Sequence, residues 1–236
     1  MHPFLLLLPG LLCDDVVWRD QVNALSTKVD STIADFSSFS SLTDMAEAAL
    51  ELAPKRFNLA GHSMGGRVAL EILRLAPERV DKLALLDTGV HPRRKGEAKK
   101  RRELVDLAYA DGMGALADVW LPPMVHPDRH DDALLMGMLR DMVLRATPDQ
   151  FARQVTALLN RPDASAQVAD IRCPTLVACG RQDAWSPLEQ HQMIAQVIPH
   201  ARLEVIENSG HMSTVEKPDA VTDALLRWLD VGKAKN

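Results

Sequence analysis

A serine stands at the centre of the segment of this chain that is best suited to chemistry. Ser63 lies in the pattern Gly61-His62-Ser63-Met64-Gly65, after an apolar run and before a helical pattern. On a sharp turn from strand to helix, a serine hydroxyl projects above the sheet, and the turn packs so closely that the two glycines can carry no side chain. The pattern therefore predicts a nucleophile at Ser63, the alternative being a chance match in a glycine-rich loop.

A serine hydroxyl needs a base to take its proton, and the base needs an acid to orient it. His211 follows the last predicted strand, and Asp183 follows the strand before it. Because parallel strands place their carboxyl ends at one edge of a sheet, we expect both to lie beside Ser63. We predict Ser63 as nucleophile, His211 as base and Asp183 as orienting acid. Asp87 also ends a predicted strand and is the other candidate acid, but capping of the loop after it explains this residue better.

Backbone N–H groups near the serine could stabilise the oxyanion that forms when a carbonyl is attacked. Gly10 lets the chain turn at the end of the first apolar run, so we assign one donor to the next residue, Leu11. The second donor is Met64, which follows the nucleophile. Four side chains near these groups are expected to contact substrate: Leu12, Trp120, Trp185 and Met212. Core packing is the alternative role for the two tryptophans.

The elements that must position these residues alternate between short apolar runs and helical patterns. This alternation is typical of a parallel sheet with helices on both faces. The predicted strands are Phe4–Leu8, Thr32–Asp35, Phe57–Ala60, Lys82–Asp87, Thr175–Cys179 and Arg202–Ile206. The predicted helices around them are Asp15–Leu25, Thr43–Leu52, Met64–Ala76, Pro187–Val197 and Asp219–Leu229.

The stretch between Asp87 and Thr175 breaks this alternation, because it has helical periodicity and no convincing strand. We expect helices in it at Gly96–Ala110, Met113–Val119, Asp131–Arg145 and Asp149–Leu159. The predicted fold class is therefore α/β, a mostly parallel sheet of about six strands flanked by helices, with an inserted helical cap. Residues 1–88 and 166–236 would form the core, and residues 89–165 the cap.

Composition disfavours several other classes of protein. The chain has 236 residues, 47% of them hydrophobic, which supplies a sizeable core and argues against disorder. A net charge of −5 and few aromatic residues argue against a nucleic-acid partner. No apolar run is long enough to span a bilayer, so we expect no membrane partner either. His126 and His130 lack a third ligand at suitable spacing, and we expect neither a metal nor a cofactor.

The apolar start of the chain superficially resembles a targeting segment. No Lys or Arg precedes its apolar run, and Pro9-Gly10 interrupts that run. Both features argue against export, so the expected location is the cytoplasm.

A basic run extends from Arg93 to Glu103 and holds seven Lys or Arg residues with two acidic ones. A solvated helix face explains this run best. The alternative is that it steers an anionic substrate toward the mouth of the site.

Together these motifs resemble the α/β-hydrolase family over the range from Phe4 to Leu229, most weakly through the predicted cap. Within that family the chain is similar to small bacterial carboxylesterases and to 3-oxoadipate enol-lactonase-like hydrolases, with likeness at 111–118 and 146–151. One departure is Pro9-Gly10, where the family usually has His-Gly before the oxyanion loop. The resemblance implies hydrolysis of a small carboxylic ester or lactone through an acyl-enzyme, without a cofactor. The same residues would also serve a thioesterase, a cofactor-free perhydrolase or a non-catalytic ligand receptor of this fold.

Overall fold

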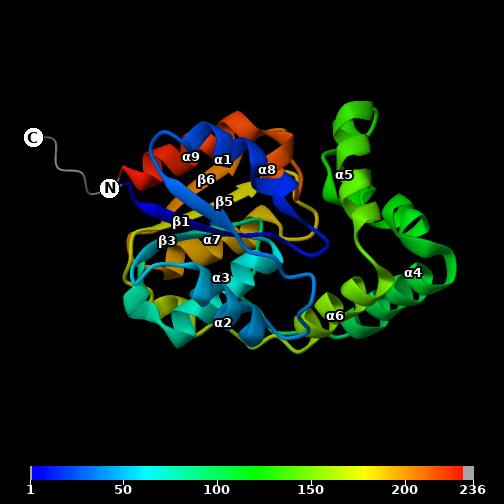
Figure 1. Ribbon diagram of the computed structural model, residues 1–236, viewed down its shortest axis with the longest axis horizontal. Coiled ribbons are helices and arrows are strands. Elements are labelled where there is room, and N and C mark those ends of the chain that lie inside the picture. The colour runs from blue at the N-terminus through cyan, green and yellow to red at the C-terminus, as the bar shows by residue number, and fades with distance from the viewer. Residues whose placement is uncertain (1, 231–236) are drawn as a thin grey trace, which may run out of the picture.

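Six strands form one parallel sheet at the centre of the computed structural model, which describes residues 2–230 of the chain (Figure 1). The strands lie in the order β2-β1-β3-β4-β5-β6, and each adjacent pair is parallel. The predicted fold class is confirmed, although β2 and β4 each begin two residues earlier than expected. The strands are β1 (Phe4–Leu8), β2 (Asp30–Ile33), β3 (Phe57–His62), β4 (Val80–Leu86), β5 (Thr175–Gly180) and β6 (Arg202–Ile206).

The central strands are mostly apolar because helices cover both of their faces. The side chains of β1 from Leu5 to Leu8 are fully buried, and every residue of β3 and β5 is buried. Leu7 pairs with Ile33 on one side and with Ala60 on the other, so it lies deep within the sheet. Such continuous apolar runs are typical of parallel strands enclosed between two layers of helices.

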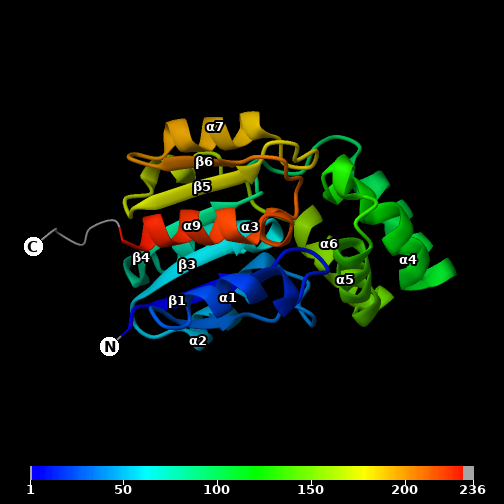
Figure 2. The same ribbon diagram turned by 90° about the horizontal axis from the view of Figure 1, so that it is seen from above.

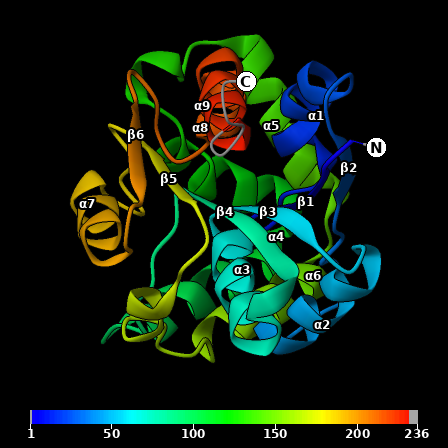
Figure 3. The same ribbon diagram turned by 90° about the vertical axis from the view of Figure 1, so that its left-hand side faces the viewer.

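Two layers of helices enclose the sheet (Figure 3). The helices α1 and α9 pack against each other on one face, with the short helix α8 beside them, while α2, α3 and α7 cover the other face. Pro218 begins α9, where its missing N–H and fixed backbone angle suit a first helical turn. The bounds of these helices are α1 (Arg19–Leu25), α2 (Leu42–Leu52), α3 (Met64–Leu75), α7 (Leu188–Val197), α8 (Ser213–Glu216) and α9 (Pro218–Leu229).

A helical insertion between β4 and β5 is formed by three helices: α4 (Glu97–Trp120), α5 (Ala133–Arg145) and α6 (Pro148–Leu159). They stand together beyond one end of the sheet (Figure 2). The two helices predicted on either side of Gly112 adjoin within α4, and the helical backbone is interrupted between them, because Gly112 has the non-helical angles φ 84° and ψ 174°. The division into a core and a cap stays a prediction.

No helix among residues 2–230 has the length and apolar character needed to cross a membrane. The predicted cytoplasmic location is not tested by this finding and stays a prediction.

Helix α3 begins directly after β3, and the backbone segments meet so closely that glycine is required at two positions. A Cβ atom added to Gly61 would lie 2.3 Å from the carbonyl oxygen of Gly65, and one added to Gly65 would lie 2.1 Å from that of Leu8. Between the two glycines, Ser63 has φ 54° and ψ −115°, a strained conformation for a residue with a side chain. The hydroxyl of Thr88 donates to the carbonyl oxygen of Ser63 at 2.6 Å and helps to hold this turn.

Replacing Gly65 by alanine is expected to destabilise the fold by at least about 3 kcal/mol, because the new methyl group would collide with the backbone of β1. Urea unfolding of the purified variant measures the change. Gly137→Ala is the matched control, since a Cβ at this position in α5 meets nothing within 4 Å. That control should gain about 0.5–1 kcal/mol from the better helix former. Equal stability of the two variants would contradict this account of the turn.

Candidate active site

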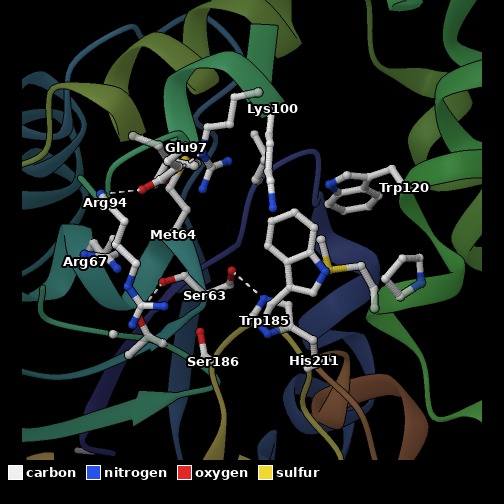
Figure 4. Close-up of a pocket in the computed structure, with 18 of the residues that line it drawn as sticks. Ser63, Met64, Arg67, Arg94, Glu97, Lys100, Trp120, Trp185, Ser186 and His211 are labelled. Atoms are coloured by element: carbon white, nitrogen blue, oxygen red, sulfur yellow. Dashed lines mark hydrogen bonds and ion pairs between the residues drawn. The ribbon is translucent and has the colours of Figure 1, made fainter. Parts of the chain in front are cut away.

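Ser63, His211 and Asp183 form a chain of hydrogen bonds at the carboxyl ends of three strands. The hydroxyl of Ser63 donates to Nε2 of His211 over 2.7 Å (Figure 4). On the other side of the ring, Nδ1–H of His211 donates to Oδ2 of Asp183 over 2.8 Å. The structure thus brings together the three residues that the sequence selects as nucleophile, base and orienting acid.

Asp183 is held as a carboxylate by donors on both of its oxygens. Oδ1 accepts the backbone N–H groups of Trp185 at 2.8 Å and of Ser186 at 2.9 Å, while Oδ2 faces His211. Burial by itself would raise the pKa of Asp183, but the charge and hydrogen bond of His211, with these two N–H groups, lower it below its usual range. The site therefore keeps a negative charge against the imidazole.

That negative charge makes His211 more basic. Burial alone would lower the pKa of His211, yet the charge and hydrogen bond of Asp183 outweigh it and raise the pKa above the ordinary 6.5. The fixed bond at Nδ1 leaves Nε2 free to accept a proton from Ser63. The arrangement can remove the proton of a serine hydroxyl and return it to a leaving group.

Asp87, the other candidate acid, forms its hydrogen bonds within residues 2–230 with groups other than the ring of His211. Its carboxyl group accepts the N–H of Gly180 at 2.9 Å and is hydrogen-bonded to the hydroxyl of Ser213. Burial and the nearby charge of Asp183 raise the pKa of Asp87 well above its usual range, which favours the neutral form. Asp87 therefore joins the ends of β4 and β5 to α8 beneath the site.

His62, next to the serine, supports the backbone of the histidine loop. Its Nε2–H donates to the carbonyl oxygen of His211 over 2.8 Å. Burial and the charge of His211 lower the pKa of His62 to about 4, so this ring is neutral when it donates. His62 thus holds the loop in place, and the histidine that is hydrogen-bonded to the hydroxyl of Ser63 is His211.

Glu216 joins the loop that carries His211 to the helical insertion. Its Oε1 accepts the N–H of Gly210 at 2.9 Å, and its Oε2 accepts the N–H of His126 at 2.8 Å. The N–H of His211 also donates to the carbonyl oxygen of Met124, in a short 3₁₀ helix after α4, at 2.8 Å. Glu216 is only 3% exposed, so these bonds form away from solvent. We name these contacts the Glu216 clamp.

The predicted oxyanion donors lie on both sides of the serine. Met64 is the first residue of α3, where a backbone N–H has no partner within the helix. Leu11 follows Gly10, whose added Cβ would lie only 3.1 Å from Cβ of Ser63, so this loop packs directly against the serine. Leu11 and Met64 both line the cavity above Ser63.

A cavity of about 480 Å³ lies over the serine and the histidine, between the sheet edge and the helical insertion. Three of the four side chains predicted to contact substrate line it: Trp120, Trp185 and Met212. Nε1 of Trp120 has no hydrogen-bond partner among residues 2–230, and the ring edge that carries it faces into the cavity (Figure 4). Leu12 lies outside this lining, because its N–H donates to Gln154 Oε1 at 2.9 Å and its side chain lines a separate pocket.

Several residues at this site were missed by the sequence analysis. Arg67 lines the cavity and could have been found, since it lies four residues after Ser63 and therefore on the same face of α3. Glu216 could not have been found, because its partner His126 is far away in the sequence.

Within residues 2–230, no three His, Cys, Asp or Glu side chains are grouped to hold a metal ion. The two histidines considered as a metal pair have protein partners. Nδ1 of His126 accepts the N–H of Asp128 at 3.1 Å, and Nε2 of His130 lies 2.9 Å from the carbonyl oxygen of Pro122.

A parallel sheet with a serine on a strained turn, and with an acid and a histidine after two later strands, is the arrangement of the α/β-hydrolase class. The model of the alpha/beta hydrolase family matches residues 5–224, so the chain belongs to this family.

Similar proteins include enzymes of several hydrolytic activities. The chain is 27% identical to a putative carbamate hydrolase RutD from Pseudomonas savastanoi, over 97% of this chain and 94% of that protein. It is also 27% identical to a pimeloyl-[acyl-carrier protein] methyl ester esterase from Nitrosomonas europaea, over 92% of each. Among solved structures, an esterase from Thermogutta terrifontis superposes with a TM-score of 0.88 and 27% identity, over 97% of this chain and 90% of that one. The enol-lactonase from Burkholderia xenovorans superposes with a TM-score of 0.89 and 25% identity, over 97% of this chain and 92% of that one.

Replacing Glu216 by glutamine tests the clamp with almost no change of volume. The amide can accept through one group only, so its NH₂ would face the N–H of either Gly210 or His126. We expect a loss of about 1–3 kcal/mol in the free energy of unfolding, measured with urea. Glu51→Gln, at an exposed position on α2, is the control and should stay within about 0.5 kcal/mol of the parent. An unchanged stability for Glu216→Gln would show that the clamp contributes little.

Proposed function

We propose that this protein is a serine hydrolase that cleaves a small carboxylic ester or lactone through an acyl-enzyme. The observation that carries the proposal is the pair of hydrogen bonds, 2.7 Å and 2.8 Å long, that align Ser63, His211 and Asp183. The cavity above them is of a size that suits a small molecule. The esterases and the enol-lactonase among similar proteins support the same class of reaction.

In the first half of the reaction, Ser63 Oγ attacks the substrate carbonyl carbon while His211 Nε2 takes the hydroxyl proton. The carbonyl π electrons move onto oxygen, and a tetrahedral intermediate forms. When this intermediate collapses, the C–O bond to the alcohol breaks, and His211 gives its proton to the leaving oxygen. In a lactone the alcohol stays attached to the acyl group as its hydroxyl.

The second half repeats these steps with water. His211 takes a proton from a water molecule, which attacks the acyl carbon, and Ser63 leaves with the proton returned by the histidine. Asp183 stabilises the imidazolium that forms in both halves and holds the ring in one orientation. Each step transfers either a proton or the acyl group, and Ser63, His211 and Asp183 supply the groups that these transfers need. The proposal therefore includes no cofactor.

The negative charge on the substrate oxygen would be stabilised by the N–H groups of Leu11 and Met64. The position of Met64 at the start of α3 adds the positive end of the helix dipole. Both groups are held by backbone before substrate arrives, so stabilising the oxyanion requires little reorganisation. Trp120, Trp185 and Met212 would enclose the remainder of the substrate.

Ser63→Ala is expected to lower turnover of p-nitrophenyl esters by about 10⁴-fold or more, because it removes the nucleophile. The assay uses a graded panel from acetate to dodecanoate, with circular dichroism to show that the fold is intact. Turnover that peaks at short acyl chains would give the size of the pocket. Full turnover by folded Ser63→Ala would overturn the proposal. No turnover by the parent on any ester would favour a lactone or a thioester as substrate, or a non-catalytic receptor.

The pH dependence should report the titration of His211, which must be neutral to accept the serine proton. Because Asp183 raises this pKa, kcat/KM should fall on acidification with a midpoint above pH 6.5. Asp183→Asn removes the charge, so its residual activity should be lower and its midpoint should move to lower pH. A midpoint below 6.5 in the parent would contradict the electrostatic role given to Asp183.

A further inference from the structure

Positive side chains dominate one wall of the cavity, although the chain as a whole has a net charge of −5. Among the described residues that line it, Glu97 is the single Asp or Glu. The Lys and Arg residues that line it are Arg67, Arg94, Lys95, Lys100, Arg101 and Arg161. Half-enclosed charges of one sign raise the local concentration of ligands of the opposite sign.

Glu97 compensates two of these cations. Arg161 donates from Nη1 and Nη2 to the two carboxylate oxygens at 2.8 Å and 2.7 Å, and Arg101 donates from Nε at 2.8 Å. Burial would raise the pKa of Glu97, but the hydrogen bonds from Arg161, from the N–H of Arg94 and from Arg101 lower it to about 2. The carboxylate is therefore fully engaged in holding this wall together.

The other four cations of the lining form no ion pair with a carboxylate within residues 2–230. They are Arg67, Arg94, Lys95 and Lys100. Arg67 is half-buried and donates from Nη1 to the carbonyl oxygen of His91 at 2.9 Å. Burial and the charge of Arg161 lower the pKa of Arg67 to about 9, as expected for a cation without a counterion. A charged group in this position is costly unless something negative binds beside it.

The unpaired cations lie close to the serine. Arg67 lies on the first turn of α3, four residues after Ser63, which corresponds to a rise of about 6 Å along a helix axis. Figure 4 shows Arg67, Arg94 and Lys100 on the walls around Ser63, with Trp120 across the cavity from the two arginines. An anion bound there and a carbonyl at Ser63 would therefore belong to the same small molecule.

The basic run of the sequence is divided by the fold into two sets. The cavity lining includes Arg94, Lys95 and Lys100, which are also exposed to solvent, and the half-buried Arg101. The other cations of the run, which are exposed and lie outside the lining, are Arg93, Lys99 and Arg102. A solvated face is a sufficient explanation for the second set, whereas the first set also borders the cavity above Ser63.

We propose that the substrate carries a carboxylate on its acyl part, which Arg67, Arg94 and Lys100 bind while the ester or lactone carbonyl lies at Ser63. This inference rests on the proposed function and narrows the substrate class to anionic esters or lactones. Arginine pairs with a carboxylate through two parallel hydrogen bonds, so the subsite would orient the acyl chain as well as attract it.

The test compares two p-nitrophenyl esters with acyl chains of equal carbon number, the adipate half-ester and the hexanoate. The parent should prefer the anionic ester by about tenfold or more in kcat/KM, and added NaCl should reduce that preference. Arg94→Ala/Lys100→Ala should lower the ratio of the two kcat/KM values about tenfold, mainly through KM for the adipate half-ester. Arg67→Gln, which keeps a donor for the carbonyl of His91, should lower the ratio further.

Lys99→Ala/Arg102→Ala is the matched control. It removes the same charge from the same basic run, yet both side chains lie outside the cavity lining. Its ratio should stay that of the parent. If both double variants lowered the ratio equally, long-range attraction would explain the preference and the subsite would be overturned. A parent that hydrolyses hexanoate and shows no preference for the anionic ester would also overturn it, with the proposed function intact.

A binding measurement separates this inference from the proposed function. Adipate should bind to the inactive Ser63→Ala variant in titration calorimetry, and adding Arg94→Ala/Lys100→Ala should weaken binding about tenfold. Lys99→Ala/Arg102→Ala in the same background should leave binding unchanged. If Arg94→Ala/Lys100→Ala weakens adipate binding and Lys99→Ala/Arg102→Ala does not, the subsite is supported even if the parent hydrolyses neither ester. Absence of adipate binding to Ser63→Ala overturns it.

Discussion

The close approach of α3 to β1 and β3 is the constraint on which the rest of this structure depends. It exists because Gly61 and Gly65 have no side chains, and because the buried leucines of β1 keep the sheet fixed beneath the helix. Its consequences follow one another along the chain. Ser63 is forced into a strained turn that lifts its hydroxyl above the sheet. Met64 lines the cavity at the start of the helix, and Arg67 lines it about one turn further on. A single backbone contact thus fixes the positions of three groups that the proposed chemistry uses.

The parts of this site that the sequence predicts are those set by local pattern and by the ends of strands. Ser63 lies in a short motif, and Asp183 and His211 follow strands whose carboxyl ends must converge, so their meeting could be expected without knowing any other contact. Leu12 shows the limit of such reasoning. It neighbours Leu11 in sequence, but its φ of 59° turns the chain, and its side chain enters a different pocket. The Glu216 clamp and the cluster around Glu97 depend on how the helical insertion folds back over the sheet, which no local pattern specifies.

Two neighbouring carboxyl groups under the site are driven in opposite directions by their surroundings. Asp183 receives two backbone N–H groups and faces an imidazole, which favours its charged form. Asp87 is fully buried beside that charge, which favours its neutral form. The fold therefore places one negative charge against His211 rather than two. The cavity wall also has fewer negative than positive charges, because Glu97 pairs with Arg161 and Arg101 and the other cations of the lining remain available to bind an anion.

The Glu216 clamp also bears on how this protein could change over evolutionary time. Helices inserted into a sheet domain are commonly treated as exchangeable parts, replaced to alter which substrates are accepted. Here the segment at 124–126 supplies the acceptor for the N–H of His211 and a donor to Glu216, so it belongs to the histidine loop as much as to the insertion. A graft that replaced residues 89–165 as a block would remove both partners. Diversity in substrate choice is therefore most accessible within α4, α5 and α6 on either side of this junction, whereas the junction should keep its backbone path because the groups it supplies are main-chain atoms.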